Sequence, residues 1–311
     1  MKKLNILFMG TPAIAVSMLD RLVADGHHIV GVVTQPDKKA GRKQQLKMSE
    51  VKEYALAHEF ACYQPIKIRE EYDAFLNMSI DLIVTCAYGQ FVPQQLLEYP
   101  TYGSINVHAS LLPKLRGGAP IHKAIINGDK ETGMSIMRMV QKMDAGAVMA
   151  QCKVRIGDDD TTGIMFDKLA VAGAELLSES VDKIIRGEAV FVEQDEASAT
   201  FAYTIQKEEE HIDFNNDVQV VYNHIRGLLP FPVGNAVVNG KKVKFHKARM
   251  VAKQHSYQPG EIVGWLENGF AIACSNGFIL VDEIQMEGKA KNDAKSFYNG
   301  AGKQLVGKCF N

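Results

Sequence analysis

Continuous apolar runs alternate with amphipathic stretches over the first third of the chain. The apolar runs, typical of strands buried on both faces, are Leu4–Met9, Ile29–Val33, Leu82–Ala87 and Ser104–Val107. The stretches between them carry apolar residues at helical spacing and predict helices over Ala13–Ala24, Ser49–Glu59 and Glu70–Asn77. Because strands that alternate with helices pair in parallel, the pattern predicts an α/β fold with a doubly wound, Rossmann-like parallel sheet.

The pattern changes in the second half of the chain. A helix over Ala119–Asn127, strands over Thr132–Val140 and Val148–Ile156, and a helix from Thr161 or Thr162 to about Arg186 come first. From Gly187 to about Asp217 the sequence is polar and irregular, and short alternating runs punctuated by Gly and Asn then predict a small antiparallel, OB-like β-barrel. We therefore expect a first domain over residues 1–189, a linker over 190–207 and a barrel domain over 208–311.

Composition excludes several classes of protein. Hydrophobic residues make up 46% and charged residues 23% of the 311 residues, as in ordinary folded chains and unlike disordered ones. No apolar run approaches the roughly 18 residues of a membrane helix, and the first run is too short for a signal peptide. The five cysteines are scattered and form no Cys-x-x-Cys pair. This excludes a disulfide framework and a cysteine-type zinc site, and it predicts a cytoplasmic location.

The charge is divided unevenly between the first 217 residues and the rest of the chain. Over the whole chain, 35 basic residues nearly balance 36 acidic ones. Residues 1–217 contain 23 basic and 30 acidic side chains, a net charge of −7, whereas residues 218–311 contain 12 and 6, a net charge of +6. A basic barrel is typical of proteins that bind RNA, although the same charge can serve solubility alone.

The segment from Gly103 to Pro113 combines groups that suit acyl-transfer chemistry. Asn106 and His108 are two residues apart on a predicted strand and face the same side, at the carboxyl end where open α/β sheets bind ligands. An Asn amide can donate to a developing oxyanion, and an adjacent His can exchange a proton near neutral pH. Asp144, in the turn between two predicted strands, is the candidate acidic partner of His108. A histidine at a strand end can equally serve only the hydrogen bonding of the sheet.

A long basic loop follows the second predicted strand. It runs from Thr34 to Ser49 and contains one acid, Asp37, against five basic residues, which are Lys38, Lys39, Arg42, Lys43 and Lys47. A loop of about 16 residues is longer than most α/β connections, and such loops are usually functional or disordered. Its positive charges suit contacts with phosphates, although a solvated lysine-rich loop has the same composition.

Short motifs, each different from the others, are distributed along nearly the whole chain. They are Gly10-Thr11-Pro12, Thr34-Gln35-Pro36-Asp37, Gly41-Arg42, Ser104 to Pro113, Arg116 to Ile121, Met143 to Gly146, Ile212-Asp213-Phe214, Ile225-Arg226-Gly227, Pro259-Gly260 and Glu287-Gly288-Lys289. With these motifs the sequence resembles the methionyl-tRNA formyltransferases, a branch of the folate-dependent formyltransferases. The Asn-x-His-x-Ser-Leu-Leu-Pro segment with a downstream Asp is specific to the folate-dependent group. The basic loop and the barrel narrow the resemblance to the tRNA enzymes.

The resemblance implies a role for each matched position. It implies that Asn106, His108 and Asp144 are catalytic, that Ser110, Leu111, Leu112 and Pro113 line a folate site, and that Lys38, Lys39, Arg42, Lys43 and Lys47 lie in a loop that reaches the tRNA acceptor end. The implied reaction transfers the formyl group of 10-formyltetrahydrofolate to the free amino group of methionyl initiator tRNA, giving N-formylmethionyl-tRNA for translation initiation. Because the folate already activates the formyl group, neither a metal nor ATP is expected. With no large apolar stripe on the predicted surface, we also expect a monomer.

Two departures and three alternatives qualify this interpretation. Leu115 and Phe231 stand where the family usually has tryptophans, which affects RNA or packing contacts rather than the three catalytic positions. A sugar-nucleotide N-formyltransferase or a 10-formyltetrahydrofolate hydrolase would share the chemistry, but a nucleotide sugar has little use for an arm with five positive charges. A catalytically silent RNA-binding protein is the third alternative, and the presence of Asn106, His108 and Asp144 together disfavours it.

Overall fold

The computed structural model describes residues 2–40 and 45–311. The chain divides into two compact units. The first unit extends to Pro120 and also contains residues 132–155 and 166–203, and the second contains residues 121–131, 156–165 and 204–311. The second unit thus includes two segments that the sequence analysis assigns to the first domain.

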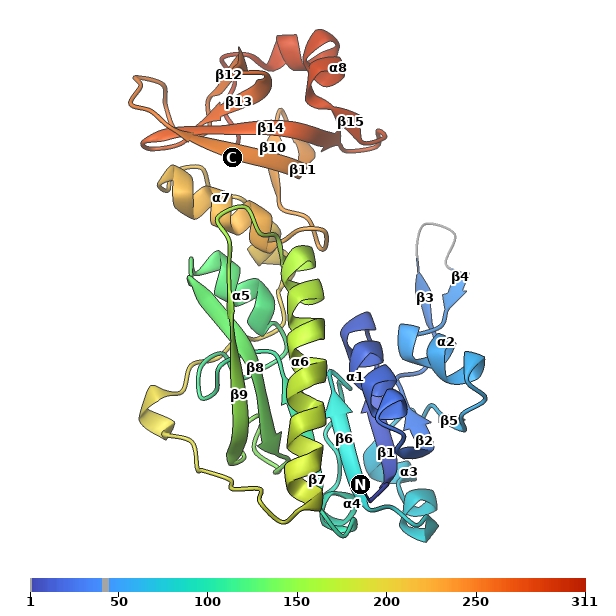
Figure 1. Cartoon of the computed structure of the whole chain (residues 1–311). Coiled ribbons are helices and arrows are strands. Elements are labelled where there is room, and N and C mark those ends of the chain that lie inside the picture. The colour runs from blue at the N-terminus through green and yellow to red at the C-terminus, as the bar shows by residue number, and fades with distance from the viewer. Residues whose placement is uncertain (1, 41–44) are drawn as a thin grey trace. The chain divides into compact units, whose positions relative to one another are not determined.

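A seven-stranded sheet forms the centre of the first unit (Figure 1). In spatial order its strands are β5 (Cys62–Tyr63), β2 (His28–Val33), β1 (Asn5–Gly10), β6 (Leu82–Cys86), β7 (Ser104–His108), β8 (Glu131–Arg138) and β9 (Val148–Arg155). The first five pair in parallel, whereas β8 runs antiparallel to β7. The predicted doubly wound parallel sheet is confirmed, and β8 makes it a mixed sheet.

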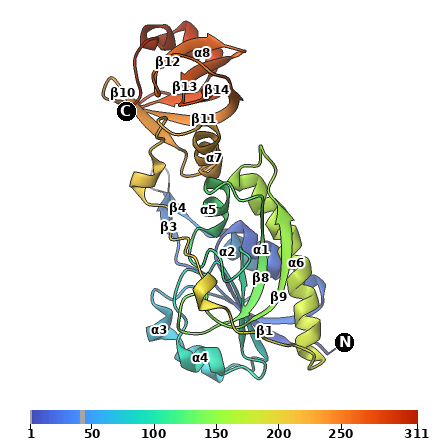
Figure 2. The same ribbon diagram turned by 90° about the vertical axis from the view of Figure 1, so that its left-hand side faces the viewer.

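Helices cover both faces of this sheet. They are α1 (Ala13–Ala24), α2 (Glu50–Ala57), α3 (Ile68–Glu71), the 3-10 helix η1 (Asp73–Asn77), α4 (Gln94–Glu98) and α6 (Thr162–Ile185). Because side chains alternate along β1, Leu7 and Met9 pack in one cluster with Ile68 and Phe75, on the face that α3 and η1 cover. Figure 2 shows α3 and α4 on one side of the sheet and α6 on the other.

The second unit contains a six-stranded antiparallel sheet. Its strands are β10 (Asn235–Val238), β11 (Lys241–Ala252), β14 (Gly277–Met286), β13 (Gly269–Ala273) and β12 (Ile262–Leu266) in spatial order, with β15 (Asn292–Asp293) beside β14. The last residues of the chain join its two edges. Ile262 of β12 donates its backbone N–H to the Lys308 carbonyl at 2.8 Å, and Val237 of β10 exchanges two backbone hydrogen bonds with Asn311. The predicted antiparallel β-domain is confirmed, and the C-terminal segment satisfies the edge groups that would otherwise stay open.

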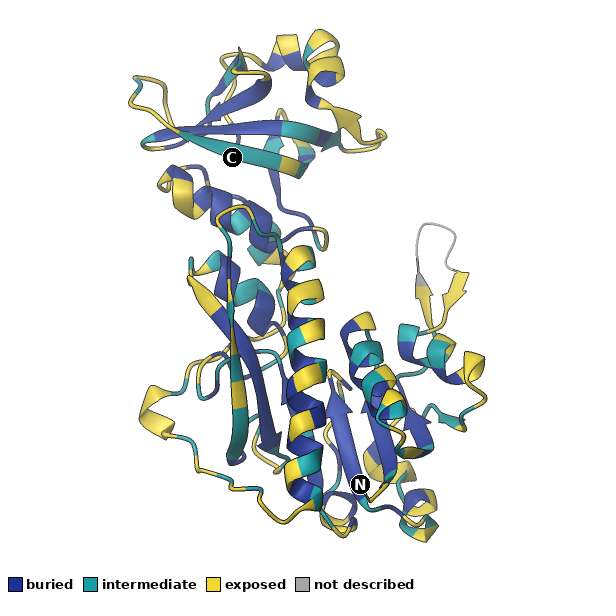
Figure 3. Ribbon diagram, in the orientation of Figure 1, coloured by how far each residue is buried: buried dark blue, intermediate teal, exposed yellow. Residues whose placement is uncertain are grey.

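Five helical segments accompany this sheet. They are α5 (Pro120–Ile126), which begins at the last residue of the first unit's opening segment, α7 (Val218–Gly227), α8 (Ala294–Asn299) and the 3-10 helices η3 (Lys207–Glu210) and η4 (Ala301–Leu305). The sequence analysis did not predict α7. Its buried residues Val218, Val221, Tyr222 and Ile225 follow helical spacing, but three of its first four residues are valine, a β-branched residue that favours strands. Figure 3 shows the buried face of α7 in dark blue.

Candidate active site

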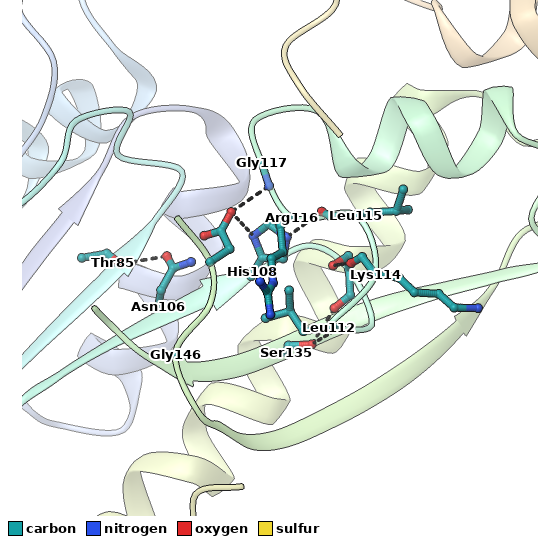
Figure 4. Close-up of polar contacts among 12 residues, drawn as sticks. Thr85, Asn106, His108, Leu112, Lys114, Leu115, Arg116, Gly117, Ser135 and Gly146 are labelled. Atoms are coloured by element: carbon teal, nitrogen blue, oxygen red, sulfur yellow. Dashed lines mark hydrogen bonds and ion pairs between the residues drawn. The ribbon is translucent and has the colours of Figure 1, made fainter. Parts of the chain in front are cut away.

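The carboxyl end of β7 presents two polar side chains. Asn106 and His108 are two residues apart on the strand, so both point to the same face of the sheet (Figure 4). β6 pairs in parallel with β7 on one side, and β8 pairs with it on the other. This is the edge at which open α/β sheets bind their ligands.

His108 has a hydrogen-bond acceptor at one ring nitrogen and a carboxylate near the other. Its Nε2 lies 3.1 Å from the backbone carbonyl oxygen of Leu115, and its Nδ1 lies 3.7 Å from Oδ2 of Asp144. A carbonyl oxygen can only accept, so Nε2 must carry a proton. Nδ1 is the ring nitrogen that faces the carboxylate. The structure thus brings together His108 and the acid that the sequence analysis selected.

Asp144 lies in the turn between β8 and β9, and neighbouring residues hold both its side chain and its backbone. Its φ angle of 48° is in the left-handed region. The backbone N–H of Gly117 donates to Oδ2 at 2.8 Å, which points the carboxylate towards His108. The side chain of Gln194 donates to the backbone carbonyls of Asp144 at 2.8 Å and of Gly146 at 2.7 Å. These bonds define where the carboxylate lies.

Gln194 joins this turn to a fully buried arginine. Its Oε1 accepts from Nε and Nη2 of Arg116 at 3.1 and 2.9 Å, and Nη2 also donates to Glu196 at 2.9 Å. A buried guanidinium needs such acceptors, because an uncompensated charge in the interior is strongly destabilising. The sequence analysis missed Gln194, since residues 190–207 carry no periodic pattern and were read as a linker.

Asn106 is oriented by a threonine on the neighbouring strand. Thr85 of β6 donates its hydroxyl proton to Oδ1 of Asn106 at 2.7 Å (Figure 4). Because the amide oxygen is engaged in this way, the amide nitrogen of Asn106 keeps its N–H donors for a ligand. The sequence analysis missed Thr85, although a threonine within the apolar run Leu82–Ala87 was a signal: buried hydroxyls almost always have a partner.

The segment predicted to line a folate site forms a rigid turn after β7. Ser110 is fully buried and donates its hydroxyl to the Lys114 carbonyl at 2.6 Å, and its own carbonyl accepts from Ser135 at 2.6 Å. Leu112 is also buried, whereas Leu111 and Pro113 are partly exposed. Of these four side chains, Leu111 and Pro113 therefore offer surface to a ligand, and that surface is apolar.

The basic loop contains a short hairpin. β3 (Lys38–Ala40) pairs antiparallel with β4 (Gln45–Lys47), so the loop is more ordered than its lysine-rich composition predicts. The predicted residues Arg42 and Lys43 lie outside the described residues. Lys38 and Lys39 are exposed, and Lys47 forms an ion pair with Glu50 at 2.8 Å. The hydrogen bond from Lys52 lowers the pKa of Asp37, so this acid is engaged at the base of the arm.

The two departures from the tryptophan pattern lie in different settings. Leu115 is 8% exposed with a φ angle of 58°, so its side chain packs inside the first unit. Phe231 of the second unit is 77% exposed.

Within residues 2–40 and 45–311, no cluster of three or more His, Cys, Asp or Glu side chains could hold a metal ion. Among those residues no helix has the length and hydropathy needed to span a membrane.

Two protein-family models match the chain. One, described as formyl transferase, matches residues 2–181, and the other, described as formyl transferase C-terminal domain, matches residues 204–302. A methionyl-tRNA formyltransferase of Bacillus mycoides is 47% identical over 300 residues, which cover 96% of each chain. The chain belongs to the methionyl-tRNA formyltransferase family. The corresponding protein of Halalkalibacterium halodurans is also 47% identical over 305 residues, covering 97% of this chain and 96% of the relative.

Solved structures of lower identity share the fold of this methionyl-tRNA formyltransferase family member. An N-formyltransferase from Helicobacter canadensis, in complex with folinic acid and dTDP-3-aminofucose, superposes with a TM-score of 0.68 at 20% identity over 89% of this chain and 98% of that one. HypX from Aquifex aeolicus, in complex with tetrahydrofolic acid, gives 0.69 at 17% identity over 98% of this chain and 48% of that one. The family and enzyme class expected from the motifs are confirmed, and the roles of individual residues stay predictions.

Proposed function

We propose that the chain transfers the formyl group of 10-formyltetrahydrofolate to the free amino group of methionyl initiator tRNA, giving N-formylmethionyl-tRNA for translation initiation. The observation that carries the proposal is the grouping of Asn106, His108 and Asp144 at the carboxyl end of β7, in a chain that matches methionyl-tRNA formyltransferases over nearly its whole length. This group contains an oxyanion donor, a proton-exchanging imidazole and an acid.

The reaction begins when the amine nitrogen attacks the formyl carbon. A new C–N bond forms, and the formyl oxygen takes up negative charge. The amide N–H of Asn106 and the Nδ1–H of the protonated His108 stabilise that oxyanion by donating to it. The amine then loses a proton, the bond between the formyl carbon and N10 of the folate breaks, and N10 takes up a proton as tetrahydrofolate leaves.

Asp144 supports the proton transfers through His108. Its carboxylate oxygen Oδ2 lies 3.7 Å from Nδ1 of His108, on the side of the ring that exchanges the proton. Since Nε2 of His108 is committed to the Leu115 carbonyl, Nδ1 is the nitrogen that exchanges the proton. Asp144 also assists removal of the proton from the amine. Because the folate supplies an activated formyl group, the chemistry needs neither ATP nor a metal.

The substrates are held by different parts of the chain. The apolar surface of Leu111 and Pro113, in the turn Ser110 to Pro113, contacts the folate. The basic arm with Lys38 and Lys39 contacts phosphates at the tRNA acceptor end. Residues 1–189 carry the catalytic groups, and residues 190–207, of which 190–203 pack with the first unit, connect them to the domain over 208–311. The basic part of that domain, residues 218–311 with a net charge of +6, binds the body of the tRNA. The proposed working form is a monomer.

A formylation assay tests this function. The protein is supplied with 10-formyltetrahydrofolate and either methionyl initiator tRNA or an amino-sugar nucleotide, and the formylated product is measured. We expect formylation of the tRNA alone, and a loss of at least about 100-fold in turnover for His108→Ala, since removing one such group from an active site costs about that much. Formylation of the sugar nucleotide alone, or release of formate with neither acceptor, would overturn the proposal.

A further inference from the structure

Two exposed aromatic side chains lie side by side on the segment that follows the 3-10 helix η2 (Glu196–Ser198). Phe201 is 48% exposed and Tyr203 is 62% exposed, whereas Ala202 between them is fully buried. This alternation is that of an extended strand with one face inward. The two rings are stacked and parallel within 5°, with centroids 5.7 Å apart, so together they form an exposed aromatic surface.

The strand that carries this aromatic surface is paired with the segment that positions the proposed catalytic residues. Arg116 donates its backbone N–H to the Thr200 carbonyl at 2.9 Å, and its own carbonyl accepts from Ala202 at 2.7 Å. The residues on either side of Arg116 bind the ring of His108 and the carboxylate of Asp144. A ligand on the aromatic surface is therefore only one strand away from the segment that holds the reacting groups.

We propose that Phe201 and Tyr203 stack against an unpaired nucleobase at the single-stranded 3′ end of the tRNA. The inference rests on the proposed function, in which methionine is esterified to the terminal nucleoside and must reach His108. Aromatic side chains stack on any base, because every base has a π-face. Stacking needs no phosphate contact, which suits a segment that carries acidic residues.

One acidic neighbour of this surface, Glu196, is compensated by basic side chains. Glu196 accepts from Arg116 at 2.9 Å and from Lys142 at 2.5 Å. These two cations hold the pKa of the Glu196 carboxyl at about 2, so it remains charged and paired at neutral pH. The repulsion between this carboxylate and the RNA backbone is thereby reduced. A base can thus approach the aromatic rings although the segment as a whole is not basic.

Steady-state kinetics of the double variant Phe201→Ala/Tyr203→Ala test the inference. We expect kcat/KM for methionyl-tRNA to fall about tenfold, within the range for loss of one base stack, while KM for 10-formyltetrahydrofolate stays unchanged. The dependence of kcat/KM on salt should keep its slope, since stacking releases no counterions. The variant Phe201→Tyr/Tyr203→Phe retains both rings and should behave as the unaltered protein. Val190→Ala, which truncates a 70% exposed side chain of the linker, is the matched control.

A binding measurement supplies a second readout that does not depend on turnover. The probe is a short single-stranded RNA that ends in CCA and carries 2-aminopurine in place of the terminal adenine or, in a second probe, of the base before CCA. The unaltered protein should quench the fluorescence of at least one probe, and the double alanine variant should not.

Three results would overturn the inference. They are an unchanged kcat/KM for methionyl-tRNA in the double variant, equal quenching by both proteins, or a rise in KM for the folate, which would assign the rings to the pterin. Equal melting temperatures of the variants and the unaltered protein show that a loss is not caused by unfolding. Failure of the proposed function can be distinguished from failure of the stacking inference, because the unaltered protein would then not formylate methionyl-tRNA at all.

Discussion

The hydrogen bond from Thr85 to Asn106 allows a sharp test of the proposed oxyanion stabilisation. Thr85 is 2% exposed, and its hydroxyl lies 2.7 Å from Oδ1 of Asn106. Thr85→Val exchanges the hydroxyl for a methyl group of similar size and keeps a residue that strands favour. The amide of Asn106 then loses the contact that distinguishes its oxygen from its nitrogen, so its N–H donors point to the formyl oxygen for only part of the time.

The structure sets the size of the expected effect. One neutral hydrogen bond is lost, worth about 0.5–1.5 kcal/mol, so kcat should fall about two- to tenfold in Thr85→Val. Asn106→Ala removes the donor itself and should lower kcat by about 100- to 1,000-fold. If Thr85 acts only by orienting Asn106, adding Thr85→Val to Asn106→Ala should lower kcat no further.

The assay is kcat for formylation of methionyl-tRNA in the two single variants and the double variant. Thr85→Ser keeps the hydroxyl and is the matched control, with kcat expected near that of the unaltered protein. The reasoning is refuted if Thr85→Val lowers kcat by the same factor in the unaltered protein and in the Asn106→Ala variant. It is also refuted if Thr85→Ser is as slow as Thr85→Val, because a methyl contact would then be the cause.

Three further predictions concern the surroundings of the site. Gln194→Glu keeps an acceptor for Arg116 but removes both donors to the Asp144 turn. We expect kcat to fall about tenfold, with a melting temperature near that of the unaltered protein, and an unchanged kcat would contradict this. Lys38→Ala and Lys39→Ala should each reduce the slope of log affinity for tRNA against log salt by about 0.7–0.9, measured by filter binding, whereas an unaltered slope would remove these lysines from the interface. The pKa of Glu196 lies at about 2, below its ordinary value of 4.5, so its contribution to stability is present above about pH 4.5 and is lost as pH falls through about 2. The urea midpoints of the unaltered protein and of Glu196→Gln should therefore differ near pH 6 and converge as the pH approaches 2, and a constant difference would contradict the assigned pKa.

Local sequence pattern was sufficient for much of the first unit. The helix predicted over Ala13–Ala24 has these bounds in the structure, and the apolar runs mark β1, β2, β6 and β7 to within about two residues. The pair Asn106 and His108 followed from the two-residue period of a strand alone. The selection of Asp144 also used the position of a turn and the resemblance to a family, and the structure places its carboxylate 3.7 Å from His108.

Only the tertiary structure decided what holds these groups in place. Gln194 lies about 50 residues beyond Asp144 in a stretch without periodicity, and Thr85 acts across a strand pair, so no local pattern identifies the partner of either side chain. The same holds for the last residues of the chain, where Asn311 bonds to Val237 and joins the sheet edges. Hydrophobic periodicity records which face of an element is buried, because burial acts on every residue of that element. A single long-range hydrogen bond depends on two side chains that the fold brings together, and it becomes visible only when the chain has folded.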